Sequence, residues 1–88
     1  MPPNKIKSNG HTVHYLIRPN KVPEIILDGI KLGIVNVSYQ WYTMIESTWT
    51  KCLLIATCVY IKNDTIHHVD LVIDEALGEA YVNDYEES

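Results

Sequence analysis

The chain has 88 residues, of which 47% are hydrophobic and 20% charged, and its formal net charge is −4. This length supports one domain with one modest core, and no run approaches the ~20 apolar residues of a membrane-spanning helix. Phosphate groups repel an acidic chain, so the net charge disfavours nucleic-acid binding. The length and composition favour a small globular protein without a membrane segment.

The first ten residues are polar and contain two prolines and two lysines. We interpret residues 1–10 as a flexible N-terminal arm. They lack the apolar core of a secretory signal, so we expect a cytoplasmic protein. Residues 11–18 alternate weakly between apolar and polar side chains and predict a strand, which Pro19-Asn20 would end.

Residues 22–33 fit two structures. As a helix, the segment has Pro23 and Glu24 in its first turn and Gly33 as its C-terminal cap. As a hairpin, it would turn at Asp28-Gly29. The apolar spacing favours the helix, and the hairpin remains the alternative.

Residues 34–45 show the clearest alternation in the chain and predict a long strand. We expect one face, which includes Val35, Val37, Tyr39 and Trp41, to be buried. The strand carries no charge before Glu46. A long uncharged strand at a sheet edge favours pairing with another chain, so we expect a homodimer.

The stretch from Lys51 to Asp74 predicts an antiparallel hairpin that turns at Asn63-Asp64, two residues that tolerate positive φ. This turn opposes Cys58 to Val69, and opposed residues share a face. The apolar face then contains Leu54, Ala56, Cys58, Val69, Leu71 and Ile73. The other face is mixed, and we expect it to be only partly covered.

Residues 75–81 suggest a short helical turn, and residues 83–88 suggest a disordered acidic tail. The whole pattern predicts a single α+β domain over residues 11–82, with a small mainly antiparallel sheet of about four strands and one helix on one face. If residues 22–33 form the hairpin, the chain is instead all-β, a small sandwich or barrel.

Four histidines raise the question of a metal site. His11 and His14 point to opposite faces of a strand, as do His67 and His68, so neither pair can chelate an ion. His68 and Asp70 share a strand face, but the sequence has no nucleophile elbow, phosphate loop or zinc-hydrolase motif. We therefore expect no enzyme activity, no metal and no cofactor.

Binding to another protein is the function that these features favour. Tyr42, Met44 and Trp49 would form an apolar patch beside the long strand. We predict a non-catalytic intracellular interaction or inhibitor domain that acts as a homodimer, of a size typical of viral accessory proteins. The alternative is a small nucleic-acid-binding module, because residues 1–31 carry five basic and two acidic groups. Its binding residues would be Lys5, Lys7, Arg18 and Lys21.

Overall fold

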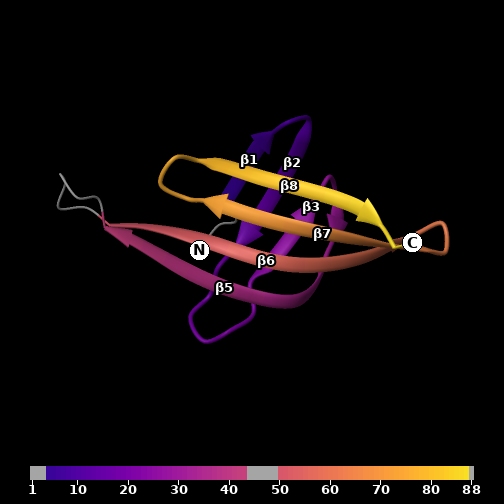
Figure 1. Ribbon diagram of the computed structural model, residues 1–88, viewed down its shortest axis with the longest axis horizontal. Helices are drawn as coiled ribbons and strands as arrows, with labels where there is room; N and C mark the ends of the chain where they lie inside the picture. The colour runs from indigo at the N-terminus through magenta and orange to yellow at the C-terminus, as the bar shows by residue number, and fades with distance from the viewer. Residues whose placement is uncertain (1–3, 44–49, 88) are drawn as a thin grey trace.

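The computed structural model describes residues 4–43 and 50–87, and these form eight strands in two antiparallel four-stranded sheets. Figure 1 shows the first sheet behind the second, with its strands crossing those of the second sheet at a steep angle. The described residues contain no helix, so the expected α+β class is wrong and the fold is all-β. None of them forms a helix that is long and apolar enough to span a membrane.

The first sheet has the order β1-β2-β3-β4. Its strands are β1 (Asn4–Ser8), β2 (His11–Leu16), β3 (Glu24–Leu27) and β4 (Ile30–Lys31). The expectation of a flexible arm is wrong for residues 4–8, which pair with β2 across a turn at Asn9-Gly10. Asn9 and Gly10 have φ values of 50° and 80°, which match the Asn-Gly hairpin turn.

The helix expected over residues 22–33 is also wrong, because the chain turns at Asp28-Gly29 between β3 and β4. Both turn residues have positive φ, 49° for Asp28 and 84° for Gly29, which a helix does not allow. The Thr12 backbone N–H donates to Asp28 Oδ1 at 2.7 Å, and His11 Nδ1 lies 2.7 Å from Asp28 Oδ2. The backbone hydrogen bond, followed by the His11 contact, holds the pKa of Asp28 below 3.8. Asp28 therefore ties this turn to the start of β2.

The second sheet has the order β5-β6-β7-β8. Its strands are β5 (Gly33–Thr43), β6 (Thr50–Lys62), β7 (Thr65–Asp74) and β8 (Glu79–Glu86). The predicted hairpin is confirmed: Cys58 opposes Val69, and Asn63 and Asp64 have φ values of 50° and 61°. The apolar face assigned from the sequence is the buried one, since all six of its residues are at most 3% exposed.

The C-terminal segment differs from the prediction. Residues 75–78 form a turn rather than a helix, and residues 79–86 form β8, which pairs with β7 from Asp74 to His67. The disordered tail is therefore wrong for residues 83–86. Asp74 is only 8% exposed, and its Oδ1 accepts a hydrogen bond from the Leu77 N–H at 3.1 Å. This carboxylate fixes the turn that brings β8 back onto the sheet.

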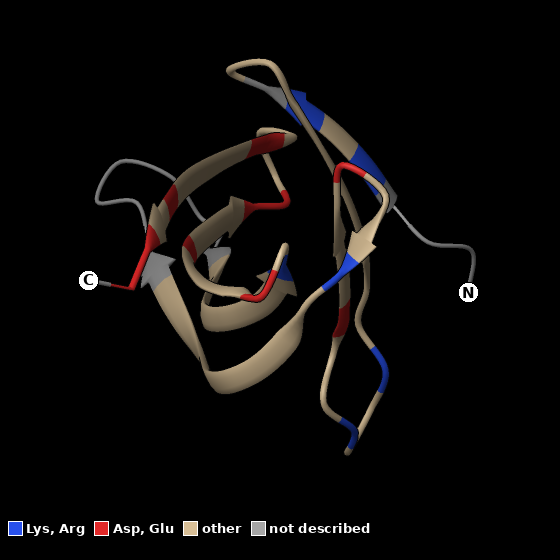
Figure 2. Cartoon of the chain, turned by 90° about the vertical axis from the view of Figure 1, so that its right-hand side faces the viewer, with Lys and Arg blue, Asp and Glu red and all other residues tan. Residues whose placement is uncertain are grey.

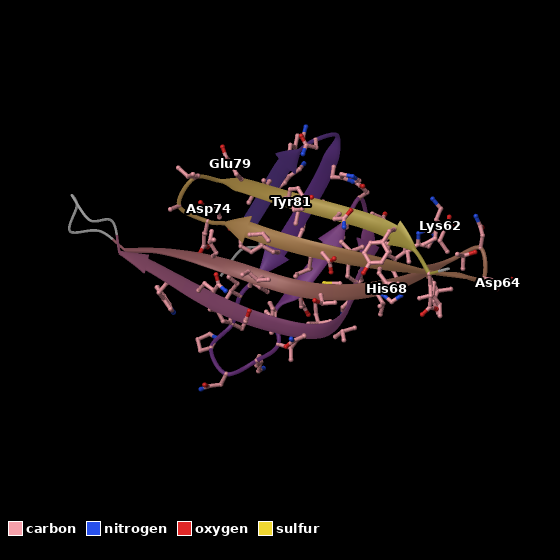
Figure 3. The ribbon with its side chains drawn as sticks, in the orientation of Figure 1. Lys62, Asp64, His68, Asp74, Glu79 and Tyr81 are labelled. Carbon is pink, nitrogen blue, oxygen red and sulfur yellow. The ribbon has the colours of Figure 1, made fainter. Side chains whose placement is uncertain are left out.

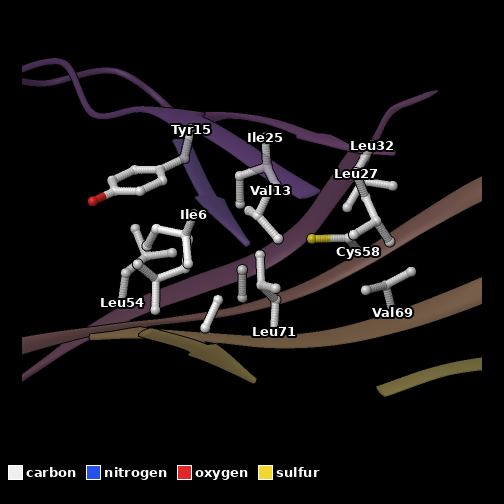
Figure 4. Close-up of a cluster of buried hydrophobic side chains, with 13 residues drawn as sticks. Ile6, Val13, Tyr15, Ile25, Leu27, Leu32, Leu54, Cys58, Val69 and Leu71 are labelled. Carbon is white, nitrogen blue, oxygen red and sulfur yellow. The ribbon is translucent and has the colours of Figure 1, made fainter. Parts of the chain in front are cut away.

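The core lies between the two sheets (Figure 4). Val13 and Ile25 from the first sheet and Leu71 and Ile73 from the second are each at most 1% exposed. Cys58 is also fully buried, and this burial, followed by the nearby Asp70 charge, raises the pKa of its thiol to about 11. Leu32 links the sheets, since the chain passes through it directly from β4 into β5.

Candidate functional site

The candidate site is a groove of about 660 Å³ between the inner side of β5 and the loop that joins β2 to β3. Residues 17–23 of this loop line one side, and Val37, Tyr39 and Trp41 line the other. We call this cavity the β5 groove. Its walls are mainly aliphatic, proline and aromatic side chains, which suit an apolar ligand surface.

The loop side of the β5 groove is shaped by a tight turn. Pro19 and Asn20 occupy its central positions, and the Lys21 N–H donates to the Arg18 carbonyl oxygen at 3.3 Å. Asn20 has a φ of 58°, and proline followed by a residue with positive φ is the pattern of a type II turn. The turn sets the two basic residues, Arg18 and Lys21, at the ends of this part of the wall.

The β5 side of the groove presents aromatic side chains that sequence reasoning expected to be buried. Tyr39 opposes Leu54 in the β5–β6 ladder, so it is on the same face as the core residues, and Trp41 is on that face as well. Yet Tyr39 is 41% exposed and Trp41 is 70% exposed. Figure 1 shows the reason: the ends of β5 and β6 extend past the strands of the first sheet, which therefore cannot cover them.

Val35 also departs from its expected burial, with 64% exposure. The β5–β6 register shifts between Ile34 and Asn36, and a β-bulge of this kind lets one residue leave the alternation. β5 is the last strand of its sheet among the described residues, and it has no charged residue from Gly33 to Thr43. The edge strand expected from the sequence is therefore in place.

The groove lining is basic although the whole chain is acidic: it contains Arg18 and Lys21 and, among the described residues, no acidic one, whereas the net charge of the chain is −4. Arg18 Nη2 lies 3.3 Å from Glu24 Oε1, and both side chains are about 40% exposed, so this ion pair is screened by water. Arg18 Nε is buried and has no hydrogen-bond partner within residues 4–43 and 50–87. Because Nε is inaccessible, only the terminal nitrogens of this guanidinium can contact a ligand in the groove.

The binding residues predicted from the sequence are only partly described. Met44 and Trp49 lie outside the described residues. Tyr42 belongs to β5 and pairs with Lys51 along the backbone, directly after the exposed Trp41. The role of these three residues in binding therefore stays a prediction.

The four basic residues of the nucleic-acid alternative do not form one surface. Lys5 and Lys7 are on β1, opposite His14 and Thr12, whereas Arg18 and Lys21 follow the far end of β2. Figure 2 shows these basic segments at opposite ends of the first sheet. A nucleic-acid backbone would have to follow the whole length of that sheet to meet both pairs.

A second polar group, formed by Tyr60, His67 and Asp84, closes one end of the inner face. The Tyr60 hydroxyl donates to Asp84 Oδ2 at 2.6 Å, and the His67 ring stacks on the Tyr60 ring at 4.7 Å. Burial, followed by the bond to Asp84, raises the pKa of Tyr60 to about 12. Tyr60 keeps its proton at neutral pH, so this group acts as a fixed structural contact.

The other histidine of this hairpin lies on the outer face. His68 stacks on Tyr85 with ring centroids 5.3 Å apart, and its Nε2 lies 3.5 Å from Glu87 Oε1. Within the described part of the chain, no group of three or more His, Cys, Asp or Glu residues is arranged to hold a metal ion. We found no match to this chain among protein-family models, curated proteins or solved structures.

Proposed function

We propose that this protein is a non-catalytic interaction module that binds an extended segment of another polypeptide by adding a strand to β5. The observation that carries the proposal is Trp41, which is 70% exposed on the inner side of an uncharged edge strand and lines the β5 groove. Exposed tryptophan is typical of binding hot spots.

The edge and the groove suit one and the same ligand. A strand added beside β5 would form main-chain hydrogen bonds with the free edge of β5, as in other cases of strand addition. Side chains of an added strand alternate between its two faces, so every second one would enter the β5 groove. The backbone would then supply affinity, and the groove would select side chains.

The opposite edge of the sheet is less suited to this role. β8 carries Glu79, Asp84 and Glu86, and β1 of the first sheet lies beside it. Charged residues on an edge strand oppose pairing with another strand. The contrast between the two edges supports β5 as the binding strand.

Peptide selection tests this function. A library of random peptides is selected on the full chain, and the binding of each selected peptide is measured by isothermal titration calorimetry. We expect the selected peptides to be extended and to lose binding to the Trp41→Ala variant. The control is Tyr81→Ala, a matched change at an exposed residue of β8, which should bind these peptides normally. Selected peptides that bind both variants equally would contradict the proposal.

Self-association is a second candidate, because a second copy could offer its own uncharged β5 as the added strand. Two antiparallel β5 strands would form one continuous sheet around a two-fold axis. Light scattering at micromolar concentration would detect this dimer, and Trp41→Ala would dissociate it. A monomer at all concentrations would exclude it.

A further inference from the structure

We infer that the segment accepted at β5 is acidic: an extended strand of a partner protein with alternating apolar side chains and a carboxylate that binds Arg18 and Lys21. This inference rests on the proposed function and specifies the chemistry of the partner.

The β5 groove has a basic side. Arg18 and Lys21 both line the β5 groove, and the groove lining contains no acidic residue. The contact of Arg18 with Glu24 spans 3.3 Å, both side chains are about 40% exposed, and most of the guanidinium donors remain available. Its Nε is buried, so an incoming carboxylate would contact the terminal guanidinium nitrogens.

The side-chain spacing of an added strand fits both sides of the groove. Alternate side chains on one face of a strand are about 6.6 Å apart. Apolar side chains can therefore contact Val37, Tyr39 and Trp41, and an acidic side chain on the same face can contact the loop. A single extended segment thus satisfies the apolar wall and the basic wall together.

A second copy of this chain satisfies the groove less well. β5 has no acidic residue between Gly33 and Thr43, so a second β5 cannot supply the carboxylate. A two-fold pairing centred on Tyr39 would also bring two basic loops to the same side of the joined sheet. Like charges placed together oppose binding, which favours a different, acidic partner.

The test uses three synthetic peptides that share one alternating apolar sequence and differ at two positions, occupied by Glu, Gln or Lys. Binding to the full chain and to its Trp41→Ala variant is measured by isothermal titration calorimetry. We expect the Glu peptide to bind about 5- to 10-fold more tightly than the Gln peptide at low salt, since one partly exposed charge-assisted contact contributes about 1 kcal/mol. The Lys peptide should bind most weakly.

Charge-neutral variants locate the effect. Arg18→Gln and Lys21→Gln should each reduce the preference for Glu over Gln. Lys62→Gln is the matched control, because Lys62 is exposed at the β6–β7 turn, far along β6 from the groove (Figure 3). Thermal melting of each variant shows that it is folded, and Lys21, an exposed loop residue, gives a test if Arg18→Gln does not fold.

The outcomes separate the two proposals. Equal binding of all three peptides that still depends on Trp41 would overturn the acidic partner and retain strand addition at β5. A dimer that Trp41→Ala dissociates, with no peptide bound, would make the second copy the occupant and overturn the inference. A monomer that binds no peptide would overturn both proposals.

Discussion

Val69 and Val72 lie on the same strand, β7, but face opposite sides of the second sheet. Val69 is fully buried against the first sheet, whereas Val72 is only partly covered on the outer face. Replacing each valine by alanine removes the same atoms from the same strand. The loss of β-propensity is therefore similar, and the difference between the variants reports the difference in burial.

The expected magnitudes follow from burial. Val69→Ala removes two buried methyl groups, each contributing about 0.8 kcal/mol, and leaves a cavity, so we expect a loss of roughly 2–3 kcal/mol in the free energy of unfolding. Val72→Ala removes methyl groups that are largely but not fully covered on the outer face, so we expect a smaller loss of roughly 1 kcal/mol.

Equilibrium urea unfolding measures both losses, and an unchanged m-value shows that the same surface is exposed in each variant. In a domain of this size each kcal/mol also lowers Tm by about 4–8 °C. Equal losses, or a larger loss for Val72→Ala, would mean that the face packed against the first sheet is assigned incorrectly.

Three further predictions concern titratable groups. Hydrogen bonds hold the pKa of Asp28 below 3.8, so its stabilising contribution is present above about pH 4 and is lost as the pH falls. Thermal melts should thus decline more steeply between pH 4 and pH 2 for the native chain than for Asp28→Asn; parallel curves would contradict this. The pKa of Tyr60 is raised to about 12, so stability should fall as the pH rises above its unfolded value of 10, and Tyr60→Phe should lack this fall in melts from pH 9 to 11.5. Burial raises the pKa of Cys58 to about 11, so iodoacetamide at pH 8 should label it in a Cys52→Ser variant only as fast as the protein unfolds. Rapid labelling of the native protein, seen by mass spectrometry, would disprove that burial.

The hairpin was predictable because its signals are local. Asn63-Asp64 sets the register, and strict alternation on both sides separates the apolar face from the mixed one. Asn9-Gly10 and Asp28-Gly29 carried similar turn signals. The polar composition around Asn9-Gly10 nevertheless predicts a flexible arm. The isoleucines around Asp28-Gly29 fit a helical period as well as a strand, so they also predict a helix.

The exposure of Trp41 could not be predicted in this way. Alternation correctly assigns Trp41 to the inner face of β5. Whether a side chain on that face is buried depends on how far the strands of the first sheet extend over it, and Trp41 is 70% exposed. The contact of Asp28 with Thr12 is also long-range, since it joins residues 16 positions apart. The β5 groove arises from such relations between distant segments, which single-sequence patterns do not contain.

Hydrogen exchange of the backbone amides tests strand addition most directly. Exchange is measured for the full chain alone and with the Glu peptide in excess. We predict slower exchange in β5, over residues 33–43, and unchanged exchange in β8, since only the first of these edges would gain main-chain partners. Protection that appears in β8 instead, or no added protection in β5 while the peptide is bound, would contradict the assignment of β5 as the binding strand.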